Sequence, residues 1–164
     1  MDDFLQQFLR IAAAIVAGGL IGLNRDMYGK PTGVRVHALV ALGAAVVTLS
    51  GTRFGIGGAD PANASRIIQG VIGGIGFLGA GVILRGETGR SNSPRIQYVT
   101  TAASIWVTAS LGIACGIGAW SLAALASLAV FVVLTIGLRL DRALYGKLGP
   151  ENEGANNEGS NNSP

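Results

Sequence analysis

The feature that most constrains this chain is a run of 43 consecutive residues, 96–138, without a single Asp, Glu, Lys or Arg. Three shorter runs, 11–24, 36–52 and 67–84, share this property. The hydrocarbon core of a bilayer is about 30 Å thick and takes about 20 helical residues to cross, so the longest run accommodates two crossings. The segment 115–118, with the sequence Cys-Gly-Ile-Gly, is the break expected between them.

These runs predict an all-α, polytopic membrane protein, because helices satisfy their own backbone hydrogen bonds in lipid. The five transmembrane helices are expected near residues 4–23, 34–52, 65–85, 97–115 and 119–139. They form one predicted transmembrane domain over residues 1–145. The remainder, 146–164, has almost nothing apolar to bury and predicts a disordered cytoplasmic tail.

The residue inventory argues against an enzyme, a metal site and a bound cofactor. One Cys and one His cannot supply a disulfide framework or a four-ligand zinc site. The glycine pattern at 74–79 imitates a dinucleotide-binding motif, but it lies inside an uncharged run, and position 99, where an acidic residue is expected, is Val. The sequence also lacks a P-loop and the common hydrolase motifs.

The basic residues give the expected orientation and exclude nucleic acid as a partner. Five alternating helices put nine Lys and Arg residues on one side, and only Arg53 and Arg66 on the other. The positive-inside rule then places the N-terminus outside and the C-terminus in the cytoplasm. Because these charges form three juxtamembrane groups and no aromatic-interleaved patch, they predict contact with the lipid bilayer. Arg10, within the first helix, is near enough to its end to reach the interface.

Small residues at helical spacing predict where the helices pack. In lipid, close backbone approach replaces hydrophobic drive between helices, so glycines three or four residues apart mark interfaces. Gly18 and Gly22 have this spacing in the first helix. The third helix is expected to be the packing centre, and the main helix-packing candidates are Gly70, Gly73, Gly74, Gly76, Gly79, Gly112 and Gly116.

A row of polar residues shares one face of the fourth predicted helix. Its members are Thr101, Ser104, Thr108 and Cys115, with Thr100 beside them. Three roles are open for the hydroxyls. They bond to a neighbouring helix at about 0.6 kcal/mol each, bond to carbonyls of their own helix, or line a narrow polar path.

The densest charge cluster follows the first helix and is a candidate partner-docking or anion-sensing surface. Asp26 is a potential ion-pair partner of Arg25 or Arg35. The competing interpretation is a set of anchoring charges with a hydrogen-bonded histidine. The cluster comprises Arg25, Asp26, Lys30, Arg35 and His37.

Four segments resemble the signature blocks of the MgtC/SapB membrane proteins. They are GLIGL at 19–23, GKPTGVRVHALVALG at 29–43, GIGFLGAGVIL at 74–84 and VTTAASIWVTA at 99–109. The resemblance implies a multi-pass protein of the bacterial inner (plasma) membrane with a periplasmic N-terminus and an association with magnesium homeostasis. For the virulence branch it also implies inhibition of the proton-driven ATP synthase.

Two departures indicate the short branch of this family. Asn24 stands before Arg25 where the family usually has an acidic residue, which shifts any role of that acid to Asp26. Thr100 and Val107 stand where virulence-branch members carry Asn and Cys, and those members continue into a soluble C-terminal domain that is missing from this sequence.

The sequence thus leads to two functional hypotheses. The first is a non-enzymatic regulator of cation (magnesium) or membrane-potential homeostasis, which acts through a membrane partner, with ATP synthase the partner that the resemblance implies and a homo-oligomer a further candidate assembly. The second is a transporter or channel for a small ion or neutral solute that uses the polar face of the fourth helix.

Overall fold

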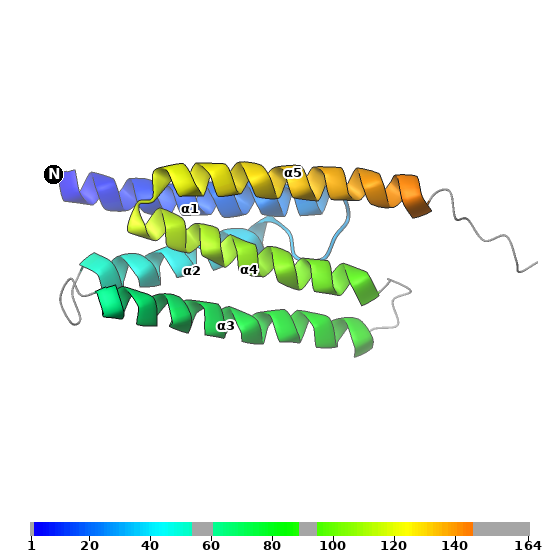
Figure 1. Cartoon of the computed structure of the whole chain (residues 1–164), viewed down its shortest axis with the longest axis horizontal. Helices are drawn as coiled ribbons and strands as arrows, with labels where there is room; N and C mark the ends of the chain where they lie inside the picture. The colour runs from blue at the N-terminus through cyan, green and yellow to red at the C-terminus, as the bar shows by residue number, and fades with distance from the viewer. Residues whose placement is uncertain (1, 54–60, 89–94, 146–164) are drawn as a thin grey trace, which may run out of the picture. The chain divides into compact units, whose positions relative to one another are not determined.

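The computed structural model describes residues 2–53, 61–88 and 95–145, and all five elements in these ranges are helices (Figure 1). Each is long and apolar enough to cross a membrane, which confirms the predicted fold class. The tail expected at 146–164 lies outside the described residues, and the orientation of the helices stays a prediction. The helices are α1 (Asp2–Met27), α2 (Val34–Arg53), α3 (Pro61–Thr88), α4 (Arg95–Ile117) and α5 (Trp120–Tyr145).

Two helices end in the same glycine-dependent motif. After α1, the Gly29 N–H donates to the Asp26 carbonyl and the Lys30 N–H to the Arg25 carbonyl. After α4, the Gly118 N–H donates to the Cys115 carbonyl and the Ala119 N–H to the Ala114 carbonyl, which is the same pattern. Both glycines have positive φ, 61° and 79°, a conformation that costs glycine little and closes a helix by capping its last carbonyls. The break expected at 115–118 is therefore confirmed.

The chain divides within α5 into two compact units, residues 1–130 and 131–164. In the first unit α2 and α4 pack against each other, α1 packs against both, and α3 packs against α4 and α2. Figure 1 shows α4 running beside α3 in this unit. The described part of the second unit is the C-terminal portion of α5, whose side chains Phe131, Val133 and Ile136 are exposed.

The closest contacts between helix backbones lie on the two sides of α2. On the α1 side, a Cβ added to Gly18 would lie 2.5 Å from the His37 carbonyl oxygen. On the α4 side, a Cβ on Gly116 would lie 2.8 Å from the Ala45 carbonyl oxygen, and one on Gly112 would overlap the Ala41 carbonyl. The absence of side chains lets these backbones approach closely. A core of small residues fills the space between them: Ala14, Ala41, Ala45, Ala114, Cys115 and Ala123.

The expectation that α3 is the packing centre is wrong for this chain. A Cβ added to Gly70, Gly73, Gly74 or Gly76 would meet nothing within 4 Å, and one on Gly79 only reaches the Ala102 methyl at 3.6 Å. The reason is that α3 makes its contacts through the branched side chains beside these glycines. The branched side chains of α3 that pack are Ile68, Val71, Ile72 and Ile75. They contact the buried residues Ala44, Ala109 and Ile113.

Candidate functional site: a buried polar cluster

A set of polar side chains is buried where α1, α2 and α4 meet, and we call it the buried polar cluster. A buried polar group costs free energy unless it is hydrogen-bonded, so its partners decide what the cluster can do. The exposed fraction of each member is 5% or less, and the members are Arg25, His37, Thr101, Ser104 and Thr108.

Arg25 brings a positive charge into the cluster from the last turn of α1. Its guanidinium donates to the Thr101 hydroxyl on α4. The Nε and one terminal nitrogen also donate to the Pro31 carbonyl oxygen, each at 3.3 Å. Arg25 therefore joins α1, the following loop and α4, and its charge is held by neutral oxygens.

His37 links the first turn of α2 to α4 and has no exposed surface. Its Nδ1 lies 3.1 Å from the Gly33 carbonyl oxygen, and its Nε2 lies 3.2 Å from the Ser104 hydroxyl oxygen. A carbonyl only accepts hydrogen bonds, so Nδ1 is the donor in the first contact. In the neutral imidazole Nε2 is then an acceptor, and the Ser104 hydroxyl, which has a single hydrogen, donates either to Nε2 or to the Thr101 carbonyl 2.7 Å away.

The loop between α1 and α2 is held by Asp26. Its carboxylate accepts the Val34 N–H at 3.0 Å, which places a negative charge at the N-terminus of α2, where the helix dipole favours it. A Cβ on Gly33 would overlap this carboxylate, so the contact depends on glycine there. Among the described residues, the ion pair considered between Asp26 and Arg25 or Arg35 is not formed.

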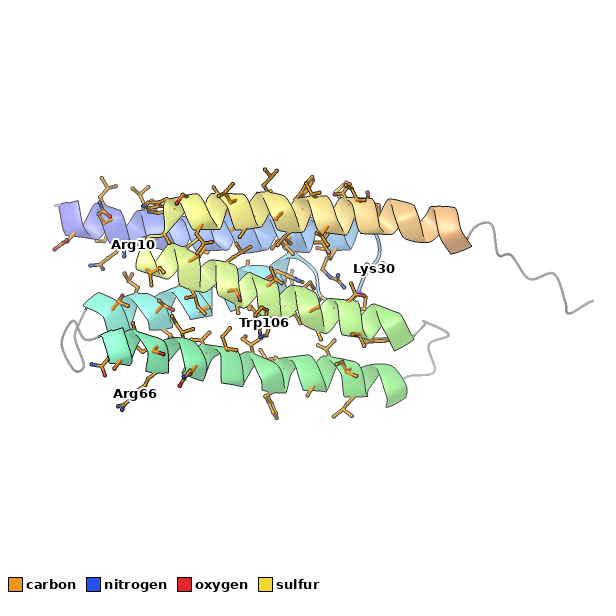
Figure 2. The ribbon with its side chains drawn as sticks, in the orientation of Figure 1. Arg10, Lys30, Arg66 and Trp106 are labelled. Carbon is orange, nitrogen blue, oxygen red and sulfur yellow. The ribbon has the colours of Figure 1, made fainter. Side chains whose placement is uncertain are left out.

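The structure separates the predicted charge cluster into two groups. Arg25 and His37 are buried in the polar cluster, and Asp26 caps α2. Lys30 is half-buried in the loop (Figure 2) and Arg35 is exposed on α2. The part of the cluster that remains at the surface consists of Lys30, Arg35 and the exposed Asp26.

The polar face of α4 is buried against α1 and α2 and not open along its length. The Ser104 hydroxyl, when it is not turned toward His37, donates to the Thr101 carbonyl at 2.7 Å, and the Thr108 hydroxyl donates to the Ser104 carbonyl at 2.8 Å. Cys115 is buried in the small-residue core, whereas Thr100 is exposed beside the face. The face therefore includes bonds to its own helix as well as bonds across to α1 and α2.

Arg10 makes a contact with the end of α4 that the sequence did not predict. Its guanidinium donates to the Gly116 carbonyl at 3.0 Å, and a Cβ on Gly118 would lie 2.7 Å from it. Figure 2 shows Arg10 beside the end of α4. A cation at a helix C-terminus is favoured by the dipole. The signal available in the sequence was an arginine inside an otherwise charge-free helix.

Thr48 on α2 is a second buried polar residue that the sequence analysis did not single out. Its exposed fraction is 1%, and its hydroxyl has no hydrogen-bond partner among the described residues. It lies against Gly116, where an added Cβ would be 3.0 Å from the Thr48 Cβ.

In the described part of the chain, no three His, Cys, Asp or Glu side chains come together as metal ligands.

Five apolar helices, three of which surround a small, internally bonded polar cluster, define a multi-pass helical membrane protein. The family comparison is consistent with this class. Residues 11–143 match the model of the MgtC family, and the chain belongs to that family.

Three relatives illustrate the similarity. Protein SrpB of Synechococcus elongatus is 41% identical over 147 residues, which cover 87% of this chain and 81% of SrpB. The putative magnesium transporter YhiD of Escherichia coli is 35% identical over 85% of this chain and 64% of YhiD. Protein MgtC of Salmonella typhimurium is 37% identical over 80% of this chain and 52% of MgtC. The chain thus spans about two thirds or less of the last two relatives, and no solved structure matches it.

Proposed function

We propose that this chain is a non-enzymatic, regulatory protein of the bacterial inner membrane that influences magnesium or membrane-potential homeostasis through contact with a membrane partner. Membership in the MgtC family and the names of the relatives support the link to magnesium. The ATP synthase is the partner that the family resemblance implies, and a second copy of the chain is the other candidate.

The observation that carries this proposal is the position of Arg25. Its guanidinium is buried and bonded to Thr101, so a fixed positive charge lies at the first residue of the α4 polar face. Two like charges 4 Å apart repel by about 4 kcal/mol at an effective dielectric constant near 20. A cation that moved along this face would meet that repulsion at Thr101, which favours regulation over cation conduction.

The second candidate is a transporter or channel that uses the polar face of α4. It is favoured by the name of the YhiD relative, a putative magnesium transporter, and by the alignment of Thr101, Ser104 and Thr108 on one buried face. A conducting state would require Arg25 to leave Thr101.

Two measurements on the full chain distinguish these functions. Magnesium flux into proteoliposomes is measured for the native chain and for the Thr101→Val/Ser104→Ala double variant. Crosslinking and pull-down from membranes of cells grown at low magnesium identify the partner. Regulation predicts background flux in both samples and a specific partner, whereas native flux that falls in the double variant would establish transport and overturn the proposal.

A further inference from the structure

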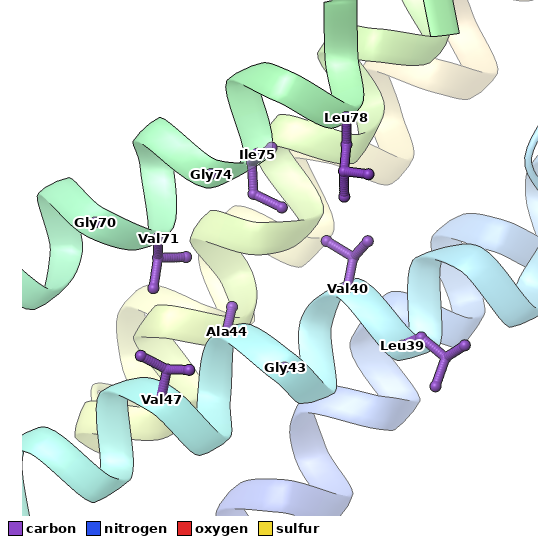
Figure 3. Close-up of a pocket in the computed structure, with 10 residues that line it drawn as sticks. All are labelled: Leu39, Val40, Gly43, Ala44, Val47, Gly70, Val71, Gly74, Ile75 and Leu78. Carbon is purple, nitrogen blue, oxygen red and sulfur yellow. The ribbon is translucent and has the colours of Figure 1, made fainter. Parts of the chain in front are cut away.

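An apolar groove of about 410 Å³ lies between α2 and α3 in the first unit (Figure 3). Both helices contribute residues with the same spacing, i, i+1, i+4, i+5 and i+8. On α2 these are Leu39, Val40, Gly43, Ala44 and Val47. On α3 they are Gly70, Val71, Gly74, Ile75 and Leu78.

Three glycines leave the groove open. A Cβ added to Gly43, Gly70 or Gly74 would meet nothing within 4 Å, and Figure 3 shows these positions between the larger side chains that line the groove. All ten lining residues are apolar, so the groove offers no hydrogen-bonding side chain to a polar ligand. In a bilayer, a groove of this kind is filled by hydrocarbon or by a protein helix.

The dimensions favour a hydrocarbon chain. The groove follows eight residue steps of each helix, which is about 12 Å at 1.5 Å per residue. A transmembrane helix of about 20 residues is about 30 Å long. Most of such a helix would lie outside the groove, whereas one segment of an extended acyl chain matches the groove in length.

Positive charge at the groove ends favours an anionic headgroup. Arg35 precedes Leu39 by one helical turn on the same side of α2. Its exposed guanidinium makes no hydrogen bond or ion pair with another described residue. Lys30 lies in the loop just before α2, at the same end (Figure 2). At the opposite end, Arg66 precedes Gly70 by one turn of α3, but Figure 2 shows it pointing away from the other helices.

We propose that this groove binds one acyl chain of an anionic phospholipid, with the lipid phosphate paired to Arg35. The glycines admit the chain, and the guanidinium gives a site for bidentate bonding to phosphate oxygens. The site is separate from the buried polar cluster and does not depend on the function proposed above.

The test uses the full chain in nanodiscs that contain phosphatidylglycerol with a photoactivatable group in its acyl chain. Gly74→Leu fills the groove. Gly76→Leu is the matched control. Gly76 is also on α3, and a Cβ there meets nothing within 4 Å, but Gly76 does not line the groove. We expect Gly74→Leu to lower the yield of lipid adducts mapped to 39–47 and 70–78 at least threefold, and Gly76→Leu to leave it unchanged.

A second pair of variants tests the headgroup. In competition between phosphatidylglycerol and phosphatidylcholine, Arg35→Gln is expected to remove the preference for the anionic lipid, whereas Arg66→Gln should retain it. Equal adduct yields for Gly74→Leu and the native chain would overturn the proposal. So would adducts located outside the groove, or a change of oligomeric state in Gly74→Leu without loss of lipid, which would identify a second copy as the occupant.

Discussion

The guanidinium of Arg25 on α1 donates a hydrogen bond to the hydroxyl of Thr101 on α4, 76 residues later in the chain. This bond joins two features that the sequence presents separately, a charged loop and a row of hydroxyls. His37 makes the second connection through Ser104, 67 residues away. The polar residues of three helices therefore form one structural unit.

The first prediction concerns the hydroxyl of Thr101. Thr101→Val keeps the shape of the side chain but removes an acceptor from the buried Arg25 guanidinium. We expect the free energy of unfolding in detergent to fall by about 1–3 kcal/mol, the cost of an unsatisfied buried group. Thr100→Val, one residue earlier at an exposed position, should change it by about 0.5 kcal/mol or less. Equal effects of the two variants would argue against the Arg25 bond.

The second prediction concerns the hydrogen on His37. Since Nδ1 faces the Gly33 carbonyl, we expect the neutral imidazole to carry its hydrogen on Nδ1 and to leave Nε2 as an acceptor, which Ser104 satisfies when its single hydroxyl hydrogen points to Nε2 instead of the Thr101 carbonyl. Nitrogen-15 NMR of the labelled imidazole distinguishes the two tautomers, and a spectrum dominated by the Nε2–H form would contradict the geometry. Ser104→Ala should shift the Nε2 resonance and leave Nδ1 protonated.

The third prediction compares two glycines that look alike in the sequence. Gly112→Ala places a methyl group against the Ala41 carbonyl and the Ala44 methyl, and should lower the free energy of unfolding by about 1–3 kcal/mol through overpacking. Gly73→Ala meets nothing within 4 Å and should raise it by about 0.5–1 kcal/mol, because alanine has the better helix propensity. Unfolding by a denaturing detergent measures both, and a destabilised Gly73→Ala variant would indicate a contact of α3 outside this chain.

The fourth prediction concerns Arg10 as a cap of α4. Arg10→Gln removes the positive charge from the α4 C-terminus and weakens the bond to the Gly116 carbonyl, so we expect a loss of about 1–2 kcal/mol in the free energy of unfolding. The matched variant Arg66→Gln, at an exposed residue, should have no measurable effect. A similar loss in both variants would mean that the free energy of unfolding depends on the total positive charge of the protein and not on the Arg10 cap.

The five helices were predictable from the sequence because a bilayer requires about 20 uncharged helical residues per crossing. The glycine pattern was less informative. Gly70 with Gly74 and Gly112 with Gly116 have the same spacing, yet only the second pair contacts another helix closely. Spacing identifies a face that permits close approach, but it does not identify the helix that approaches.

The polar residues were likewise found individually but not as a cluster. The sequence placed Thr101, Ser104 and Thr108 on one face and Arg25 beside His37, because these relationships are local. Their contact depends on the way α1, α2 and α4 pack together, which involves residues far apart in the chain. The acyl-chain groove depends on packing in the same way.

The position of α2 has a consequence for how this protein changes shape. The backbones of two neighbouring helices contact α2 closely on opposite sides, at Gly18 on α1 and at Gly112 and Gly116 on α4. Rotation or sliding of α2 would drive its larger side chains into those backbones. Helix α3 has no such backbone contact at Gly70, Gly73, Gly74 or Gly76 and packs through side chains such as Ile67, which lies against Gly51 of α2. Any conformational change that accompanies function is therefore expected to repack α3 while α1, α2 and α4 behave as a rigid block.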